Sequence, residues 1–110
     1  MKADEIYLLH IQDAVQRILS YTTEGEHAFM SDSKTQDAVI RNIEIIGEAT
    51  KKLSDEFKNK HVDVPWKQMA GMRNILIHHY FGVKLDLVWQ VVVRDLPSLM
   101  SKLSFIINPT

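Results

Sequence analysis

The sequence predicts an all-α protein, an up-and-down bundle of four or five helices in a single domain over residues 1–110. Apolar residues recur at three- and four-residue steps through most of the chain, and no segment alternates as a strand would. Glycine and proline are scarce, with four and three residues, and they separate the helical segments. A hydrophobic fraction of 45% is enough for one core.

Two long helices are predicted in the first half of the chain. The first covers residues 4–21, and its apolar stripe consists of Ile6, Leu9, Asp13/Ala14, Ile18 and Tyr21. Ser31-Asp32-Ser33 offers N-cap oxygens for the second helix, which we expect to continue to about Phe57. Its stripe consists of Val39, Ile43, Ile46, Ala49, Leu53 and Phe57. Gly47 inside it costs about 1 kcal/mol relative to Ala, which a close helix–helix approach would explain.

The second half predicts a loop at residues 58–63 and two further helices. Pro65 suits the first turn of a helix from Trp66 to Tyr80 that stops near Gly82. Asp86 is the expected cap of the next helix, from about Leu87. Pro97 lies inside that pattern, so we expect a kink or break at residues 94–97. The apolar face then continues through Leu99, Met100, Leu103 and Ile106.

Composition excludes several classes of protein. The net charge of −1 excludes a strongly basic nucleic-acid binder, although a local basic site remains open. The absence of cysteine excludes disulfides and cysteine-bound zinc. The five histidines form no familiar ligand spacing with carboxylates, so we expect no metal. No run of about 18 apolar residues occurs and the first residues do not form a secretory signal, so we expect a cytoplasmic protein without a membrane span.

The most informative segment is residues 73–80, RNILIHHY, which gathers an arginine, an amide, two imidazoles and a phenol in a helical pattern. Buried polar groups without partners cost about 1–3 kcal/mol each, so such a cluster indicates chemistry or ligand binding near the surface. At 100° per residue, the core-facing side consists of Met69, Met72, Ile75, Leu76 and His79. The opposite side consists of Lys67, Ala70, Gly71, Asn74 and His78.

This geometry favours His78 over His79 as the functional histidine. Asn74 and His78 are four residues apart and can touch, and Ala70 and Gly71 leave room beside them for a ligand or a second chain. Arg73 and His78 are five apart, so their directions diverge by about 140°. They converge only through the reach of the arginine, a distortion of the helix, or a second subunit.

Residues 72–83, MRNILIHHYFGV, closely resemble the signature of HepT-like proteins in the HEPN superfamily. In that signature an Arg, usually followed by Asn, precedes a His by four to six residues, and a Tyr lies two positions after the His. Val64-Pro65-Trp66, Val88-Trp89 and residues 41–49, RNIEIIGEA, also resemble family positions. The resemblance extends over nearly the whole chain.

The resemblance implies an HEPN-type bundle that forms a homodimer, with its two motifs facing each other across a cleft. It implies the toxin of a type II-like toxin–antitoxin system whose antitoxin is a minimal nucleotidyltransferase of the MNT type. It further implies a metal-independent endoribonuclease without a cofactor, with RNA as substrate and Arg73, Asn74 and His78 as catalytic residues. Some relatives are silenced by transfer of AMP to the motif tyrosine, here Tyr80.

Two alternatives to a nuclease remain open. The same groups suit a non-catalytic nucleotide-binding module or an accessory subunit of a nucleotidyltransferase, because they recognise phosphate without turnover. The near-neutral charge is compatible with that role, since a nonspecific ribonuclease often benefits from a broad positive field. The other alternative is a purely structural dimeric bundle. Cleavage of RNA in EDTA distinguishes the nuclease from both.

Overall fold

The computed structural model describes residues 2–78 and 84–107, without the side chains of residues 2 and 73–78. Its elements are α1 (Lys2–Tyr21), α2 (Glu26–Met30), α3 (Ser33–Lys52), α4 (Asp55–Lys60), α5 (Trp66–His78), α6 (Leu85–Gln90), the π-helical turn η1 (Val91–Asp95) and α7 (Leu96–Ile107). All regular structure within these described residues is helical, which confirms the predicted all-α class.

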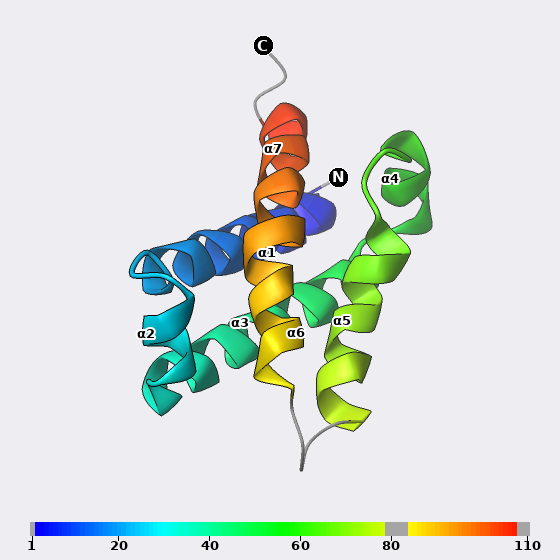
Figure 1. Ribbon diagram of the computed structural model, residues 1–110. Helices are drawn as coiled ribbons and strands as arrows, with labels where there is room; N and C mark the ends of the chain where they lie inside the picture. The colour runs from blue at the N-terminus through cyan, green and yellow to red at the C-terminus, as the bar shows by residue number, and fades with distance from the viewer. Residues whose placement is uncertain (1, 79–83, 108–110) are drawn as a thin grey trace.

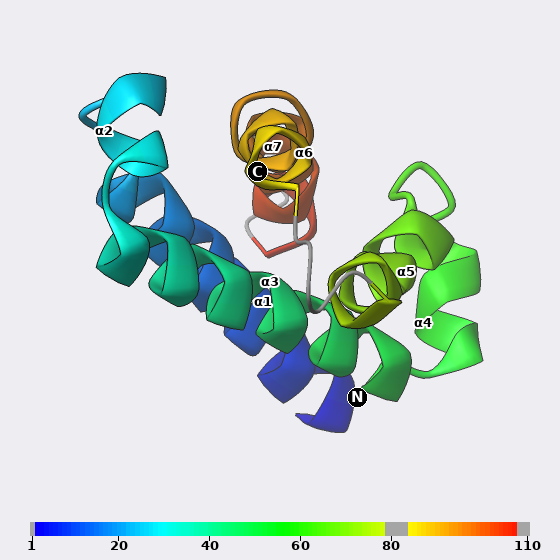
Figure 2. The same ribbon diagram turned by 60° about the horizontal axis from the view of Figure 1, so that its bottom comes forward.

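The helices pack in two layers, and α3 contacts helices of both. The antiparallel helices α1 and α3 form one layer, and the short helix α2 connects them (Figure 1). Helices α6, η1 and α7 follow one another end to end as a rod, which lies with α5 on the same side of α3 (Figure 2). Because α3 packs against both α1 and α5, it links the first layer to the helix that carries the motif.

The apolar stripe predicted for the second helix is confirmed from Val39 to Leu53, whereas the stripe predicted for α1 is confirmed only at Ala14 and Ile18. On α3, the buried side chains are Val39, Ile43, Ile46, Ala49 and Leu53. On α1, Ile6, Leu9 and Tyr21 are 52%, 47% and 45% exposed, and the core side consists of Leu8, Ile11, Ala14, Val15 and Ile18. Apolar residues occupy more than half of the circumference of α1, so their spacing alone does not select the side that α3 covers.

The long second helix of the prediction is in fact two helices. Helix α3 ends at Lys52, and the Oγ of Ser54 accepts a hydrogen bond from the Phe57 N–H (3.1 Å) as the N-cap of α4. The carboxylate of Asp4 in turn accepts hydrogen bonds from the Ser54 N–H (2.8 Å) and Oγ–H (2.7 Å). The break therefore depends on a partner 50 residues earlier, and the predicted loop at 58–63 is helical as far as Lys60.

The link between Asp4 and Ser54 predicts a pH-dependent stability. The backbone and side-chain hydrogen bonds from Ser54 hold the pKa of the buried Asp4 carboxyl below its usual range. Since the folded pKa is the lower one, this stabilisation is complete above the unfolded pKa of about 3.9 and is lost as the pH falls through the folded value. We expect Asp4→Asn to lower the thermal unfolding midpoint at pH 7 by several degrees, and the difference from wild type to shrink in acid.

Thermal scans monitored by circular dichroism between pH 7 and pH 3 measure this difference. Asp13→Asn is the matched control, because Asp13 is an exposed carboxylate on the same helix. A constant difference between Asp4→Asn and wild type across this range would contradict the role of the ionised carboxylate.

Helix capping follows the prediction at α3 but not at α6. Asp32 caps α3 by accepting a hydrogen bond from the Lys34 N–H (3.1 Å), as expected. At α6 the N-cap residue is Lys84, and Asp86 lies in the first turn, so the capping role predicted for Asp86 is wrong. A negative side chain is favourable in that turn without capping it, because it faces the positive end of the helix dipole. The short helix α2, which follows Gly25 at φ 95°, was not predicted.

Pro97 produces a π-helical turn instead of the predicted kink or break. A proline has no N–H to donate, and its ring crowds the carbonyl four residues earlier, here that of Val93. The Leu96 N–H donates to the Val91 carbonyl five residues back, and α7 continues directly from there. A single wider turn thus accommodates the proline within the rod.

Candidate functional site

The predicted catalytic residues lie on the second half of α5. Arg73, Asn74 and His78 all belong to this helix, and their side chains are not described. His79 and Tyr80, like the predicted stop at Gly82, lie outside the described residues. The backbone is α-helical through His78, so Arg73 and His78 keep their separation of about 140° around the axis. Distortion of the helix before His78 therefore has no support here.

The start of α5 is fixed by the residues around Pro65. The Pro65 carbonyl accepts the first helical hydrogen bond, from the Met69 N–H (3.0 Å). Pro65 is thus the residue just before the first turn of α5, where the sequence predicted it within that turn. The Trp66 side chain is buried, and its Nε1–H donates to the His61 carbonyl (2.9 Å). Its ring centroid lies 5.8 Å from that of Phe57. The tryptophan thus anchors the motif helix to α4.

The described half of α5 agrees with the predicted division into two sides. Met69 and Met72 are buried against the core, as expected. Gly71, on the side predicted for Asn74 and His78, has no described atom within 4 Å of the position that a Cβ would occupy. The described neighbours thus leave this side of the helix open beside Gly71.

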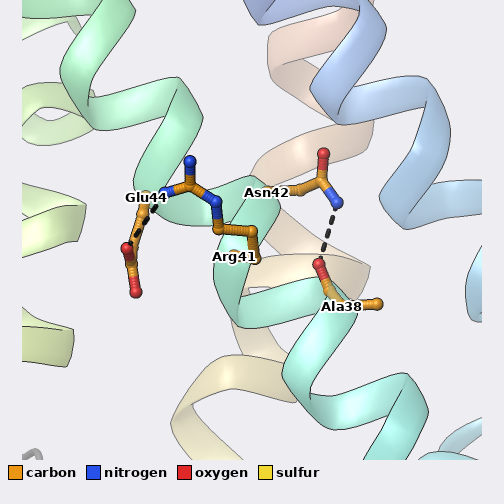
Figure 3. A network of polar contacts seen from close by, with 4 residues as sticks. All are labelled: Ala38, Arg41, Asn42 and Glu44. Atoms are coloured by element: carbon orange, nitrogen blue, oxygen red, sulfur yellow. Dashed lines mark hydrogen bonds and ion pairs between the residues drawn. The ribbon is translucent and has the colours of Figure 1, made fainter.

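Helix α3 carries a group of polar contacts of its own at residues 38–44 (Figure 3). Arg41 and Glu44 form an exposed ion pair, with 3.5 Å between Nη1 and Oε2. Asn42 is buried; its Nδ2 donates to the Ala38 carbonyl (2.8 Å), and its Oδ1 has no partner among the described residues. In the sequence, the signal for this buried amide is that Asn42 falls on the same apolar stripe as Val39 and Ile46.

The described residues assemble no metal site. Within residues 3–72 and 84–107, no three His, Asp or Glu side chains come close enough together to bind a metal ion. Likewise, none of the described helices is long and apolar enough to cross a membrane. Among the described side chains around α5 are Lys67 and Gln68, and groups of this kind suit phosphate recognition.

Comparison with known proteins finds sequence similarity to a ribonuclease family over most of the chain. The family model described as "Ribonuclease HepT-like" matches residues 11–106. A "Probable ribonuclease HepT" from Thermococcus cleftensis is 47% identical over 97 residues, which cover 87% of this chain and 88% of the relative. A "Putative RNase" from Caldanaerobacter subterraneus is 39% identical over 112 residues, covering 98% of this chain and 97% of the relative.

Another relative is considerably longer than this chain. A "Gamma-glutamylcyclotransferase and putative RNase" from Methanocaldococcus jannaschii is 49% identical over 100 residues, which cover 90% of this chain. The chain spans 45% of the length of that relative. No solved structure matches the chain.

Proposed function

Because this chain belongs to the ribonuclease HepT-like family, as its match over residues 11–106 shows, we propose that it is a metal-independent endoribonuclease acting through Arg73, Asn74 and His78. Family membership confirms the expected enzyme class, a ribonuclease. The observation that supports the finer proposal is the placement of all three residues on one continuous helix, α5, which packs on the central helix α3.

The chemistry requires three tasks that these side chains are able to perform. A base takes the proton from the 2′-OH, a donor stabilises the charge on the phosphate, and an acid protonates the 5′ leaving oxygen. The imidazole of His78 suits proton transfer because histidine ordinarily titrates near neutrality. The Arg73 guanidinium suits the phosphate oxygens through paired N–H donors, and Asn74 suits orientation of His78 or a phosphate oxygen. The expected products carry a 2′,3′-cyclic phosphate and a 5′-OH.

We propose that the active unit is a homodimer in which Arg73 of one subunit works with His78 of the other. The angular separation on a regular α-helix supports this arrangement, since one chain alone presents the two residues on different sides. The open surface at Gly71 supports it as well, because a second chain needs room there. Each such site has one His78, which can take the proton from the 2′-OH and then pass it to the 5′ leaving oxygen.

The biological role proposed is that of the toxin in a toxin–antitoxin pair with an MNT-type nucleotidyltransferase, acting in the cytoplasm. Transfer of AMP to the Tyr80 hydroxyl would add a phosphate to the same sequence motif as Arg73, where it could pair with the guanidinium and block RNA. Mass spectrometry after co-expression with the neighbouring nucleotidyltransferase tests this. Full neutralisation of the toxin with Tyr80 unmodified would argue against it.

Cleavage of RNA by the purified protein in EDTA tests the nuclease itself. We expect wild type to cut, and both His78→Ala and Arg73→Ala to lose about 10²–10⁴-fold in rate, the usual contribution of a positioned acid–base or charge-stabilising group. Equal cleavage by all three proteins would identify a contaminating nuclease. Binding of RNA or nucleotide without any cleavage would favour the accessory-subunit function.

A further inference from the structure

A groove on the side of α5 that faces the rod carries charges that the catalytic motif does not include. It has a volume of about 290 Å³, and its floor consists of the buried side chains of Met69, Met72 and Leu99. Gln68 lines it from α5, and Arg94, Ser98 and Lys102 line it from the rod. Arg94, Ser98 and Lys102 are spaced four residues apart, so they lie along one side of the rod.

A second, shallower hollow of about 650 Å³ continues from this groove around the start of α5. The two share Pro65 and Gln68, and the second adds Lys58 and Lys67. Together they are lined by four cationic side chains and one carboxylate, that of Asp95, although the whole chain has 13 basic and 14 acidic residues. The combined surface, called the basic groove below, is thus a local positive region on a chain of net charge −1.

The cations of the basic groove form no close ion pair with a carboxylate of the described residues, although Lys58 interacts with Asp4 at longer range. Within the described part of the chain, none of Lys58, Lys67, Arg94 and Lys102 lies within 4 Å of a carboxylate oxygen, whereas Arg41 and Lys60 do form such pairs. Arg94 and Lys102 are eight residues apart, which is about 12 Å along a helix. Two cations at this separation along an apolar floor suit two separate charges of a polyanion better than one small anion.

The basic groove lies around the first half of α5, ahead of the proposed catalytic residues in the chain. Lys67 of its second hollow is on the same side of α5 as Asn74 and His78, whereas Met69 and Met72 of the first hollow are on the other side. Met72 in its floor immediately precedes Arg73, and Gln68 lies about 7.5 Å before Arg73 along the axis of α5. A strand cleaved at the motif must place its neighbouring nucleotides on adjacent surface. Among the described residues, the basic groove is a nearby surface whose charge is complementary to phosphate.

We propose that the basic groove binds the backbone of single-stranded RNA next to the scissile phosphate, with Arg94 and Lys102 each contacting a phosphate. The proposal rests on the ribonuclease function proposed above and adds a substrate-binding surface to it. The apolar floor suits contact with bases, which is tolerant of sequence. The Asp95 carboxylate repels phosphate in the same groove. Removing its charge should therefore strengthen RNA binding, whereas removing the charge of Arg94 or Lys102 should weaken it.

The test measures binding of a fluorescein-labelled single-stranded RNA whose 2′-OH groups are replaced by fluorine, so that binding is followed without 2′-OH transesterification. Fluorescence anisotropy is recorded at roughly 50 to 300 mM salt, a range in which phosphate contacts make the binding constant fall steeply with salt. We expect Arg94→Gln and Lys102→Gln each to reduce the salt slope by about 0.7, equivalent to about fivefold weaker binding near 0.1 M salt. Asp95→Asn should bind more tightly than wild type.

The matched control is Arg17→Gln, which removes an exposed arginine of α1 outside both hollows. Thermal unfolding of every variant verifies that it is folded. If Arg94→Gln and Lys102→Gln match Arg17→Gln in Kd and salt slope, the basic groove does not bind RNA. If Asp95→Asn weakens binding, the effects are structural and the proposal fails.

Comparison with cleavage separates this proposal from the function on which it rests. Wild-type protein that neither binds nor cleaves RNA would overturn both. Wild-type protein that cleaves RNA in EDTA, while the Arg94 and Lys102 variants bind and cleave as well as the control, would overturn only the basic groove.

Discussion

Mixing the Arg73→Ala and His78→Ala variants is expected to restore ribonuclease activity that neither variant has alone. In a mixed dimer, Arg73 of one subunit faces His78 of the other at one site, and the second site lacks both. Random exchange of subunits should then give roughly a quarter of the wild-type activity, since half of the dimers are mixed and each has one complete site. Against single variants reduced about 10²–10⁴-fold, this is a large recovery.

The measurement is RNA cleavage in EDTA after the two variants are unfolded together and refolded. Each variant refolded alone is the control for spontaneous recovery. If both residues act from the same chain, no mixed dimer has a complete site, and the mixture stays as inactive as its components. The experiment therefore decides between the reach of Arg73 within one chain and a site shared between subunits.

Ile46→Ala is expected to lower the free energy of unfolding by about 2–5 kcal/mol, because it removes a fully buried side chain from the central helix. The loss includes the transfer of the deleted carbons to water and the cavity left between packed helices. Domains are commonly stable by only about 5–15 kcal/mol, so the variant should unfold at much lower denaturant. Urea denaturation followed by circular dichroism measures the difference.

Ile6→Ala makes the same chemical change on the exposed side of α1 and is the matched control. Ile6 is 52% exposed, so its truncation should change the free energy of unfolding by no more than about 0.5 kcal/mol. Equal losses for the two variants would mean that Ile6 is covered in solution, for example by a second subunit. The comparison thus also examines the side of α1 that faces the core.

The local pattern of apolar residues predicted the fold where a helix has one apolar side. It failed where a partner far away in the sequence determines the end of a helix. The stripe of α3 was predictable because its buried residues recur with the period of one helix face. The break at Ser54 was not, because the acceptor that holds it is Asp4, far away in the sequence. The continuity of the rod through Pro97 was also missed, since a wider turn and a broken helix have the same sequence signal.

The candidate site was predicted by motif spacing more than by composition. Arg73 and His78 were singled out because polar groups cluster in an apolar helical pattern, and the structure confirms that this segment is helical as far as His78. The basic groove was not predicted, because Lys58, Arg94 and Lys102 come from different elements and each resembles an ordinary surface cation in the sequence. Only the packing of α5 beside the rod brings such residues onto one surface.

The hydrogen bonds between Asp4 and Ser54 have a consequence for folding during translation. The Asp4 carboxylate has no Ser54 to bind until the chain has grown by 50 more residues, which includes the whole of α3. Until then α1 can form its local helix but has neither α3 beside it nor Ser54 at its first turn. During synthesis α1 is therefore fixed in place only after the chain has reached the start of α4, which leaves this part of the nascent chain more exposed to proteases and chaperones before that point.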